Sequence, residues 1–491
     1  MTLRRLTSKS NVKVTALSTS FYADYRVRSG AVALLREDTE SPPEALVQSI
    51  WQHQRLRREQ LRTLDGDPVR ILHPGFKNVE GGPDFRGAVI QIGDGPMLTG
   101  DIEVDLRSSG WHAHGHDRNP AFKNVILHAV WESEQRAPGG PPLLLLRTVL
   151  DATLGELSLW LGSDAAQELP AEFRGKCCAP LKVLPDDRLR ELLQQAAHVR
   201  LRGKASLLQA RAREAGWEQA LWEGLFRALG YKHNVWPMQR LGELRSRWGT
   251  SNGEPLPLEA RLFGIGGLLP ADLSRTQPGS DRYLRKIWDL WWRERDEFSD
   301  CLLPKPLWRM HGLRPANHPH RRLALASRWT VKPDLPRDLE RWCAKEIPDS
   351  RLADSLLEIL AVAPDDYWNW HYTLRSPRLA RAQPLLGATR VTDLAVNVIL
   401  PWLWIRASEG KNATVQRRVE QRYLAWPSAE DNSLLRLARQ RLLGSPRQAA
   451  LKGAAAQQGL IQMIRDFCER TNSLCDNCKL PGLVETFATG R

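Results

Sequence analysis

The sequence of 491 residues contains no long hydrophobic run. A membrane-spanning helix needs ~20 predominantly apolar residues in a row, whereas the most apolar segment, residues 396–405, is short and includes Asn397 and Pro401. The first 30 residues are basic and lack the apolar segment of a secretion signal. We therefore expect a cytoplasmic protein that does not cross a membrane.

Cysteine is scarce, and its seven copies are an odd number. In a long chain without a secretion signal, this count argues against a disulfide framework. The cysteines are expected to bind a metal or to be buried thiols.

Acidic residues are fewer than basic ones, with 56 Asp and Glu against 70 Lys and Arg, which gives a net charge of +14. Such a surplus favours a polyanionic partner. The balance of 42% hydrophobic and 26% charged residues is that of a globular protein. At about 150 residues per domain, the length allows about three domains.

Changes of composition divide the sequence into four parts. Residues 1–40 form a basic, poorly patterned tail. Residues 41–180 hold short apolar runs between glycine-rich turns, which indicates a small mixed sheet with flanking helices. Residues 181–465 hold repeated amphipathic stretches, which indicates a larger all-α domain, and residues 466–491 form a short segment that contains cysteines. The expected fold class is α+β.

The hydrophobic periodicity also predicts single elements. Residues 44–61 have a helical spacing and open the sheet domain. The predicted strands are residues 69–72, 88–92, 101–106 and 125–131, and the polar residues 111–123 between the last two can hold a short helix. The clearest helices of the second domain are residues 188–215, 218–229, 352–362 and 434–443.

Acidic side chains gather in the predicted sheet. A Gly-Gly-Pro turn delivers Asp84 to the start of one strand, and Glu103, Asp105 and Arg107 alternate along the next. A period of two puts these three side chains on one face. Carboxylate oxygens at a sheet edge suit Mg²⁺ or Mn²⁺, and Arg107 would stabilise negative charge there. The alternative is a solvated strand face with an acidic turn.

Three histidines follow that strand at alternate positions, His112, His114 and His116, with Asp117 next to them. Neutral imidazole is a good ligand for Zn²⁺ and other transition metals. The alternative is a polar loop whose histidines contact the backbone. His128, on an apolar strand, is expected to be a hydrogen-bonded core histidine.

The order of these features resembles the PD-(D/E)xK nuclease superfamily: a helix, a strand with Asp, a strand with Glu-x-Lys, a helix and a strand. The matching residues are Glu44 or a neighbour on the opening helix, Asp84, and Glu103 followed by Asp105. The resemblance implies hydrolysis of phosphodiester bonds with a divalent metal. Asp105 stands where the motif has Lys, so Arg107 or Lys77 would have to supply the positive charge.

The motifs GGPDF, GDIEVDLRSSGWHAHGH, NVILHAVWE and LGYKHN also resemble an uncharacterised bacterial family, domain of unknown function 2851. The resemblance extends over most of the chain after the tail. It supports the fold prediction and implies no particular activity.

Near the C-terminus, Cys468, Cys475 and Cys478 lie within eleven residues. Cys-x-x-Cys is a common half-site for Zn²⁺ or an Fe–S cluster. Cys177, Cys178 or a histidine would be the fourth ligand. Buried thiols without a metal are the alternative.

Two segments of the helical domain are rich in cations and have few or no acids. Residues 302–333 contain seven Lys or Arg and no Asp or Glu, with tryptophans between them. Residues 367–392 contain four Arg and again no acid, beside Trp368 and Trp370. Cations can hold phosphates, and exposed rings can stack on bases. The candidate nucleic-acid contacts are Arg314, Arg321, Arg322 and Arg375. The alternative is a solvated face, with most of the 19 tryptophans in the core.

Two functions therefore compete. The first is a metal-dependent nuclease with nucleic acid as its partner, and the second is a non-catalytic nucleic-acid-binding or scaffolding protein with a structural metal. A third possibility is a zinc hydrolase that acts through His112, His114 and His116 on another substrate. The sequence names no protein partner.

Overall fold

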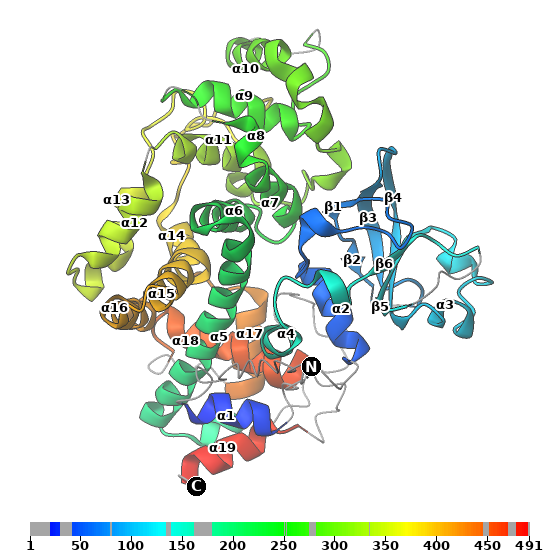
Figure 1. Cartoon of the computed structure of the whole chain (residues 1–491). Helices are drawn as coiled ribbons and strands as arrows, with labels where there is room; N and C mark the ends of the chain where they lie inside the picture. Colours follow the sequence, from blue (N-terminus) through cyan, green and yellow to red (C-terminus); the bar gives the residue numbers. More distant parts are fainter. Residues whose placement is uncertain are drawn as a thin grey trace, which may run out of the picture.

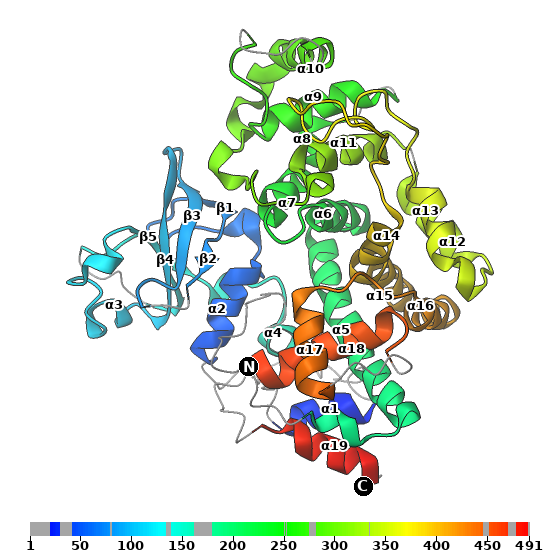
Figure 2. The same cartoon turned by 180° about the vertical axis from the view of Figure 1, so that it is seen from behind.

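The computed structural model describes residues 20–29, 42–78, 81–133, 139–161, 179–249, 251, 253–273, 281–332, 334–444, 451–469 and 478–489. A small sheet domain lies beside a much larger helical domain (Figures 1 and 2). The predicted α+β class is confirmed. Among the described helices, none has both the length and the apolar character that crossing a membrane requires.

The sheet domain is built on six strands, β1 (Val69–His73), β2 (Phe76–Lys77), β3 (Phe85–Ile92), β4 (Met97–Arg107), β5 (Val125–Glu132) and β6 (Leu143–Leu145). Their order is β1-β3-β4-β5-β6, and β2 pairs with β3. β1, β3 and β4 are antiparallel, whereas β4, β5 and β6 are parallel. Parallel neighbours cannot be joined by a tight turn. The segment between β4 and β5 therefore crosses from one end of the sheet to the other.

That crossover contains the short helix α3 (Gly110–Ala113) and the 3-10 turn η2 (Pro120–Phe122). A short helix was predicted in this segment, and each of the four predicted strands lies within an observed one. β2 and β6 were not predicted because two and three residues are too few to show an alternating pattern.

Helix α2 (Glu44–His53) packs on the sheet through its buried Val47, Ile50 and Trp51. The prediction that this helix continues to residue 61 was wrong. Gln54 takes a left-handed conformation, with φ of 50°, which ends the helix. Arg55 then turns inward and its Nε lies 2.8 Å from Oδ2 of Asp151.

The other α-helices follow in chain order. They are α4 (Leu154–Trp160), α5 (Asp186–Ala215), α6 (Trp217–Leu229), α7 (Val235–Glu243), α8 (Arg245–Trp248), α9 (Pro255–Ile265), α10 (Asp281–Glu294), α11 (Pro319–Thr330), α12 (Leu335–Ala344), α13 (Leu352–Leu360), α14 (Ala388–Leu394), α15 (Leu400–Glu409), α16 (Ala413–Ala425), α17 (Ser433–Leu443), α18 (Ala454–Ile464) and α19 (Leu480–Thr489). The four helices predicted for this domain correspond to α5, α6, α13 and α17.

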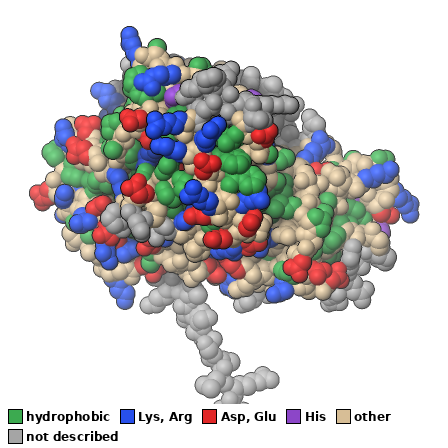
Figure 3. All heavy atoms as spheres, turned by 90° about the horizontal axis from the view of Figure 1, so that it is seen from above, with side chains coloured by type: hydrophobic (Ala, Val, Ile, Leu, Met, Phe, Trp, Pro, Cys, Tyr) green, Lys and Arg blue, Asp and Glu red, His purple; other side chains and the backbone are tan. Residues whose placement is uncertain are grey.

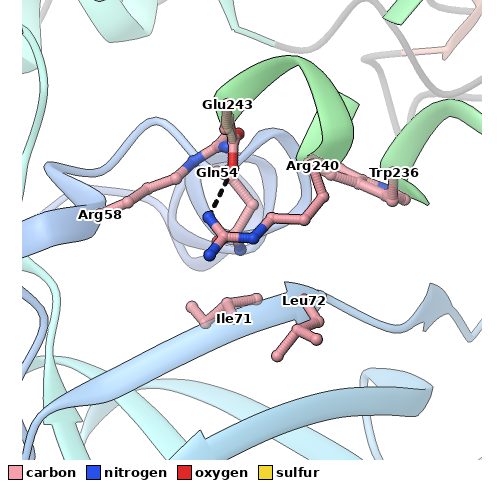
Figure 4. A pocket seen from close by; sticks show the side chains of 7 residues that line it. All are labelled: Gln54, Arg58, Ile71, Leu72, Trp236, Arg240 and Glu243. Atoms are coloured by element: carbon pink, nitrogen blue, oxygen red, sulfur yellow. Dashed lines mark hydrogen bonds and ion pairs between the residues drawn. The ribbon is translucent and has the colours of Figure 1, made fainter. Parts of the chain in front are cut away.

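The two domains share a packed interface. Leu72 of β1 and Val89 of β3 belong to the same hydrophobic cluster as the core of the helical domain. Beside them lies a small pocket lined by Gln54, Arg58, Ile71, Leu72, Trp236, Arg240 and Glu243. Figure 4 shows Arg58, from the sheet domain, and Arg240, from α7, directed toward Glu243. One buried carboxylate thus binds guanidinium groups from both domains.

Within the predicted tail, residues 21–28 form a helix, α1 (Phe21–Arg28), that is part of the folded body. Its Tyr22 and Arg26 are buried against α5 and the C-terminal helices. Arg26 donates two hydrogen bonds of 3.0 Å to the carboxylate of Asp466, and the Tyr22 hydroxyl donates a third of 2.8 Å. Asp466 is fully buried.

We expect Arg26→Ala to release α1, because the substitution leaves a buried carboxylate without its cation. Breaking a buried ion pair costs about 3 to 5 kcal/mol, so amide exchange within α1 should accelerate at least ~100-fold. Exchange mass spectrometry on the full chain measures this. Arg28→Ala, which changes an exposed arginine of the same helix, is the control. Equal protection of α1 in both variants would show that the pair of Arg26 with Asp466 does not hold this helix in place.

Candidate metal centre

Asp84 and Glu103 are held together by the pairing of β3 with β4. The backbone N–H of Asp84 donates a hydrogen bond of 3.1 Å to Oε2 of Glu103. The backbone N–H of Val104 donates one of 3.1 Å to Oδ2 of Asp84. Both carboxylates are thus fixed by backbone groups of the neighbouring strand.

Helix α2 brings a third carboxylate to the same place. The side-chain amide of Gln48 donates to Oδ1 of Asp84, at 2.8 Å, and to Oε1 of Glu44, at 3.2 Å. Glu44 lies one turn before Gln48, in the first turn of α2. The structure therefore joins Glu44 to Asp84 through Gln48, a residue that the sequence analysis missed. The i, i+4 spacing from Glu44 was the available signal.

Asp105 lies beyond Glu103 on β4 and is 4% exposed. Its Oδ2 lies 2.9 Å from Nε2 of His128, which is 1% exposed on the neighbouring strand β5. A Cβ at Gly110 would lie only 3.0 Å from the carboxylate of Asp105, so glycine leaves this carboxylate room at its observed position. The prediction that His128 is a hydrogen-bonded core histidine is confirmed, and its partner belongs to the candidate site.

The crossover segment places two histidines next to these acids. Nδ1 of His116 lies 3.5 Å from Oε1 of Glu103, and Nδ1 of His114 lies 3.7 Å from Oδ1 of Asp105. The ring of His116 stacks on Phe122 with centroids 3.9 Å apart, and it also contacts the rings of Trp111 and His114. These aromatic contacts fix the orientation of His116.

His112 is paired with another acid, Asp117. Its Nδ1 lies 3.3 Å from Oδ2 of Asp117, and its side chain is 46% exposed. The structure thus brings two of the three predicted histidines to the acids and pairs the third with Asp117.

Burial and mutual repulsion disfavour the ionised forms of these acids. Burial, with the charges of Asp84 and Asp105, raises the pKa of Glu103 to about 9. Burial, offset in part by the hydrogen bond from Val104 and reinforced by Glu44, raises the pKa of Asp84 to about 6. The pKa of Glu44 is also raised, by burial and by Asp105. The carboxylates of α2, of Asp84 directly before β3, and of β4 therefore repel one another.

A divalent cation fits this arrangement. Its charge would remove the repulsion among the carboxylates, and their oxygens are the ligands that Mg²⁺ and Mn²⁺ prefer. Burial lowers the pKa of His116, which favours the neutral imidazole that a metal needs.

Two cations were predicted as partners of the acids. Lys77, on β2, is half-buried, and burial lowers its pKa while the charge of Asp84 raises it. Arg107 is exposed at the end of β4, at the register position of Glu132. Of these two cations, Lys77 is thus the one whose charge is shown to act on an acid of the site, Asp84.

The predicted nucleic-acid contacts divide into two pairs. Arg321 and Arg322 are 1% and 4% exposed, and their guanidinium groups donate to backbone carbonyls, including those of His371 and Leu385. The prediction that these two bind nucleic acid was wrong for this fold, because both guanidinium groups are buried and their terminal nitrogens already donate hydrogen bonds inside the protein. Arg314 and Arg375 are exposed, so their role stays a prediction.

The aromatic rings near these cations are also mostly internal. Trp308, Trp329 and Trp368 are buried, so they do not offer a surface for base stacking. Figure 3 shows basic and acidic side chains interspersed over the face that is seen from above. The basic surplus does not form a single-sign patch on that face.

Of the predicted cysteine ligands, Cys468 and Cys478 are half-buried beside the cluster formed by α1, α5 and the C-terminal helices. Cys475, Cys177 and Cys178 lie outside the described residues. A metal at the cysteines stays a prediction.

The raised pKa of Glu103 predicts how the stability of the metal-free protein depends on pH. Between the unfolded value of 4.5 and the folded value of about 9, the folded state keeps a proton that the unfolded state has lost. The free energy of unfolding should therefore fall as the pH rises, by on the order of 3 kcal/mol between pH 5 and pH 8. In Glu103→Gln this loss should be much smaller, and the remainder is due to Asp84, whose pKa is raised to about 6.

Thermal unfolding of wild type and Glu103→Gln, with chelator at pH 5 and pH 8, measures the effect. The melting temperature of the variant should exceed that of wild type more at pH 8 than at pH 5. Asp94→Asn, in the exposed turn between β3 and β4, is the control. An equal difference in melting temperature at both pH values would show that protonation of Glu103 does not cause the pH dependence of stability.

The comparisons with known proteins add a family and no activity. No curated protein and no solved structure matches the chain. Residues 44–433 match the family model described as "Protein of unknown function (DUF2851)". This match begins at Glu44 and includes both the sheet with its acids and histidines and most of the helical domain. Since it spans more than half of the sequence, the chain belongs to the DUF2851 family.

Proposed function

We propose that the sheet domain is a divalent-metal-dependent phosphodiester hydrolase that acts on nucleic acid. The observation that carries the proposal is the convergence of Glu44, Asp84 and Glu103, from three different elements, beside a half-buried lysine. Buried carboxylates that repel one another weaken the fold unless a cation binds them. A cluster of groups that destabilises the fold in this way is more typical of a functional site than of a structural one.

A bound divalent ion would hold a phosphate oxygen and lower the pKa of water. The chain supplies the rest. The carboxylates of Asp84 and Glu103 are fixed by backbone N–H groups, so they would bind the ion without reorganising. Gln48 orients Glu44 toward Asp84. Lys77 is the cation that would stabilise negative charge developing on phosphate oxygens.

The order of elements supports this proposal. Helix α2 carries Glu44, β3 begins after Asp84, β4 carries Glu103, and α3 and β5 follow. This is the order of the PD-(D/E)xK pattern that the sequence resembles. Asp105 at the Lys position departs from the pattern, and Lys77 on β2 supplies a cation from another strand.

The net charge of +14 supports a polyanionic substrate. The exposed Arg314 and Arg375 are candidates for contact with phosphates outside the site. We do not extend this role to Arg321 and Arg322, which are buried.

Asp84→Ala and Glu103→Ala should each lower divalent-dependent cleavage at least ~100-fold, because each removes a metal ligand and with it several kcal/mol of charge stabilisation. Labelled single- and double-stranded DNA and RNA, with Mg²⁺ or Mn²⁺, are the test substrates. Asp94→Ala, an exposed acid of the same sheet, should cleave like wild type. Cleavage that survives both site substitutions, or its absence in wild type on all four substrates, would favour a non-catalytic binding protein.

Lys77→Ala should lower the rate of cleavage at saturating substrate by about 100-fold, with metal affinity retained. Arg107→Ala tests the other predicted cation and should have a smaller effect because Arg107 is exposed. Lys123→Ala, an exposed lysine of the same domain, is the matched control. A larger loss for Arg107→Ala than for Lys77→Ala would transfer the role to Arg107.

A further inference from the structure

Next to the acids that we assign to the first ion, a second set of ligand atoms converges. Asp105, His114 and His116 each offer one such atom, and all three atoms lie within 4.8 Å of one another. Asp105 comes from the sheet and the two histidines come from the crossover segment. Their residue types differ from those of the first set, which is made of carboxylates alone.

His116 gives independent support for a ligand at this place. Its side chain is only 10% exposed, and its Nδ1 is buried without a hydrogen-bond partner in the described part of the chain. A buried polar atom without a partner costs about 1 to 3 kcal/mol. The stacking on Phe122 nevertheless keeps the ring in this orientation. The atom lies 3.5 Å from Oε1 of Glu103 without a hydrogen bond to it, so it is positioned to bind a further partner.

Asp105 is positioned in a similar way. The buried His128 binds its Oδ2 at 2.9 Å, which leaves Oδ1 on the side of His114, 3.7 Å from that ring. A fixed carboxylate with one oxygen directed at two imidazoles is a preorganised ligand set.

We infer that Asp105, His114 and His116 bind a first-row transition-metal ion, of the kind represented by Mn²⁺ and Zn²⁺, as a second ion beside the carboxylate site. Two imidazoles and one carboxylate favour such an ion over Mg²⁺, which prefers oxygen ligands. Glu103 would lie beside both ligand sets, because its Oε2 accepts a hydrogen bond from the backbone N–H of Asp84 and its Oε1 lies 3.5 Å from Nδ1 of His116. The inference deepens the proposed function, and metal binding can be measured without cleavage.

Mn²⁺ is the probe of choice, because it binds oxygen and nitrogen ligands and has little affinity for the thiolates near the C-terminus. Metal-free full-length protein is titrated with Mn²⁺ in the presence of excess Mg²⁺. Electron spin echo spectroscopy then detects nitrogen-14 of a coordinated imidazole. We expect bound Mn²⁺ with imidazole modulation, and at least 10-fold weaker binding in His114→Ala and in His116→Ala.

The matched control is His112→Ala, which removes a histidine of the same segment that faces Asp117. It should leave both affinity and modulation unchanged. His114 is 57% exposed, so His114→Ala should fold even if His116→Ala does not. Absence of imidazole modulation in wild type, or modulation and affinity that persist in His114→Ala, would overturn the inference. Modulation without any cleavage would support the metal site and overturn only the proposed hydrolase.

Discussion

The parallel pairing of β4 with β5 is the constraint on which the candidate site depends. It sets Glu103 beside His128 in the register and lets the buried imidazole reach Asp105. It also requires a crossover from the end of β4 back to the start of β5. That crossover is short and carries His114 and His116, so they return over the acids of β4. An antiparallel β5 could follow a tight turn, and the histidines would have no reason to lie there.

Much of this arrangement is predictable from the sequence, and a definite part is not. The period of two places Glu103 and Asp105 on one face of the sheet, and the glycine-proline turn places Asp84 at the start of a strand. The contact of Asp105 with His128 depends on strand direction, which an alternating pattern does not contain. Gln48 was missed for a related reason. Its role depends on how α2 lies on the sheet, and helical spacing gives only the face that is buried.

The run of cations in the helical domain shows why composition misled. Residues 302–333 contain no acid, which suggested a surface for phosphates. Arg321 and Arg322 instead bind carbonyl oxygens of residues 361–387, a segment with neither helix nor strand. Irregular backbone leaves carbonyls without ladder partners, and a buried guanidinium with five donors satisfies several at once. The groups that accept hydrogen bonds from these arginines are backbone carbonyls. Every residue has one, so the sequence does not show which of them need a buried donor.

The bonds between α1 and Asp466 join residues 440 positions apart. During synthesis α1 is made early, and its carboxylate partner arrives only after nearly all of the helical domain. Closing so long a loop costs conformational entropy and is slow, and the stabilising contacts form only once the loop has closed. The sheet domain, whose strands lie within residues 69–145, has no such delay. The growing chain can therefore hold a folded sheet domain before Asp466 has been made, and only after that can Tyr22 and Arg26 form their bonds to it.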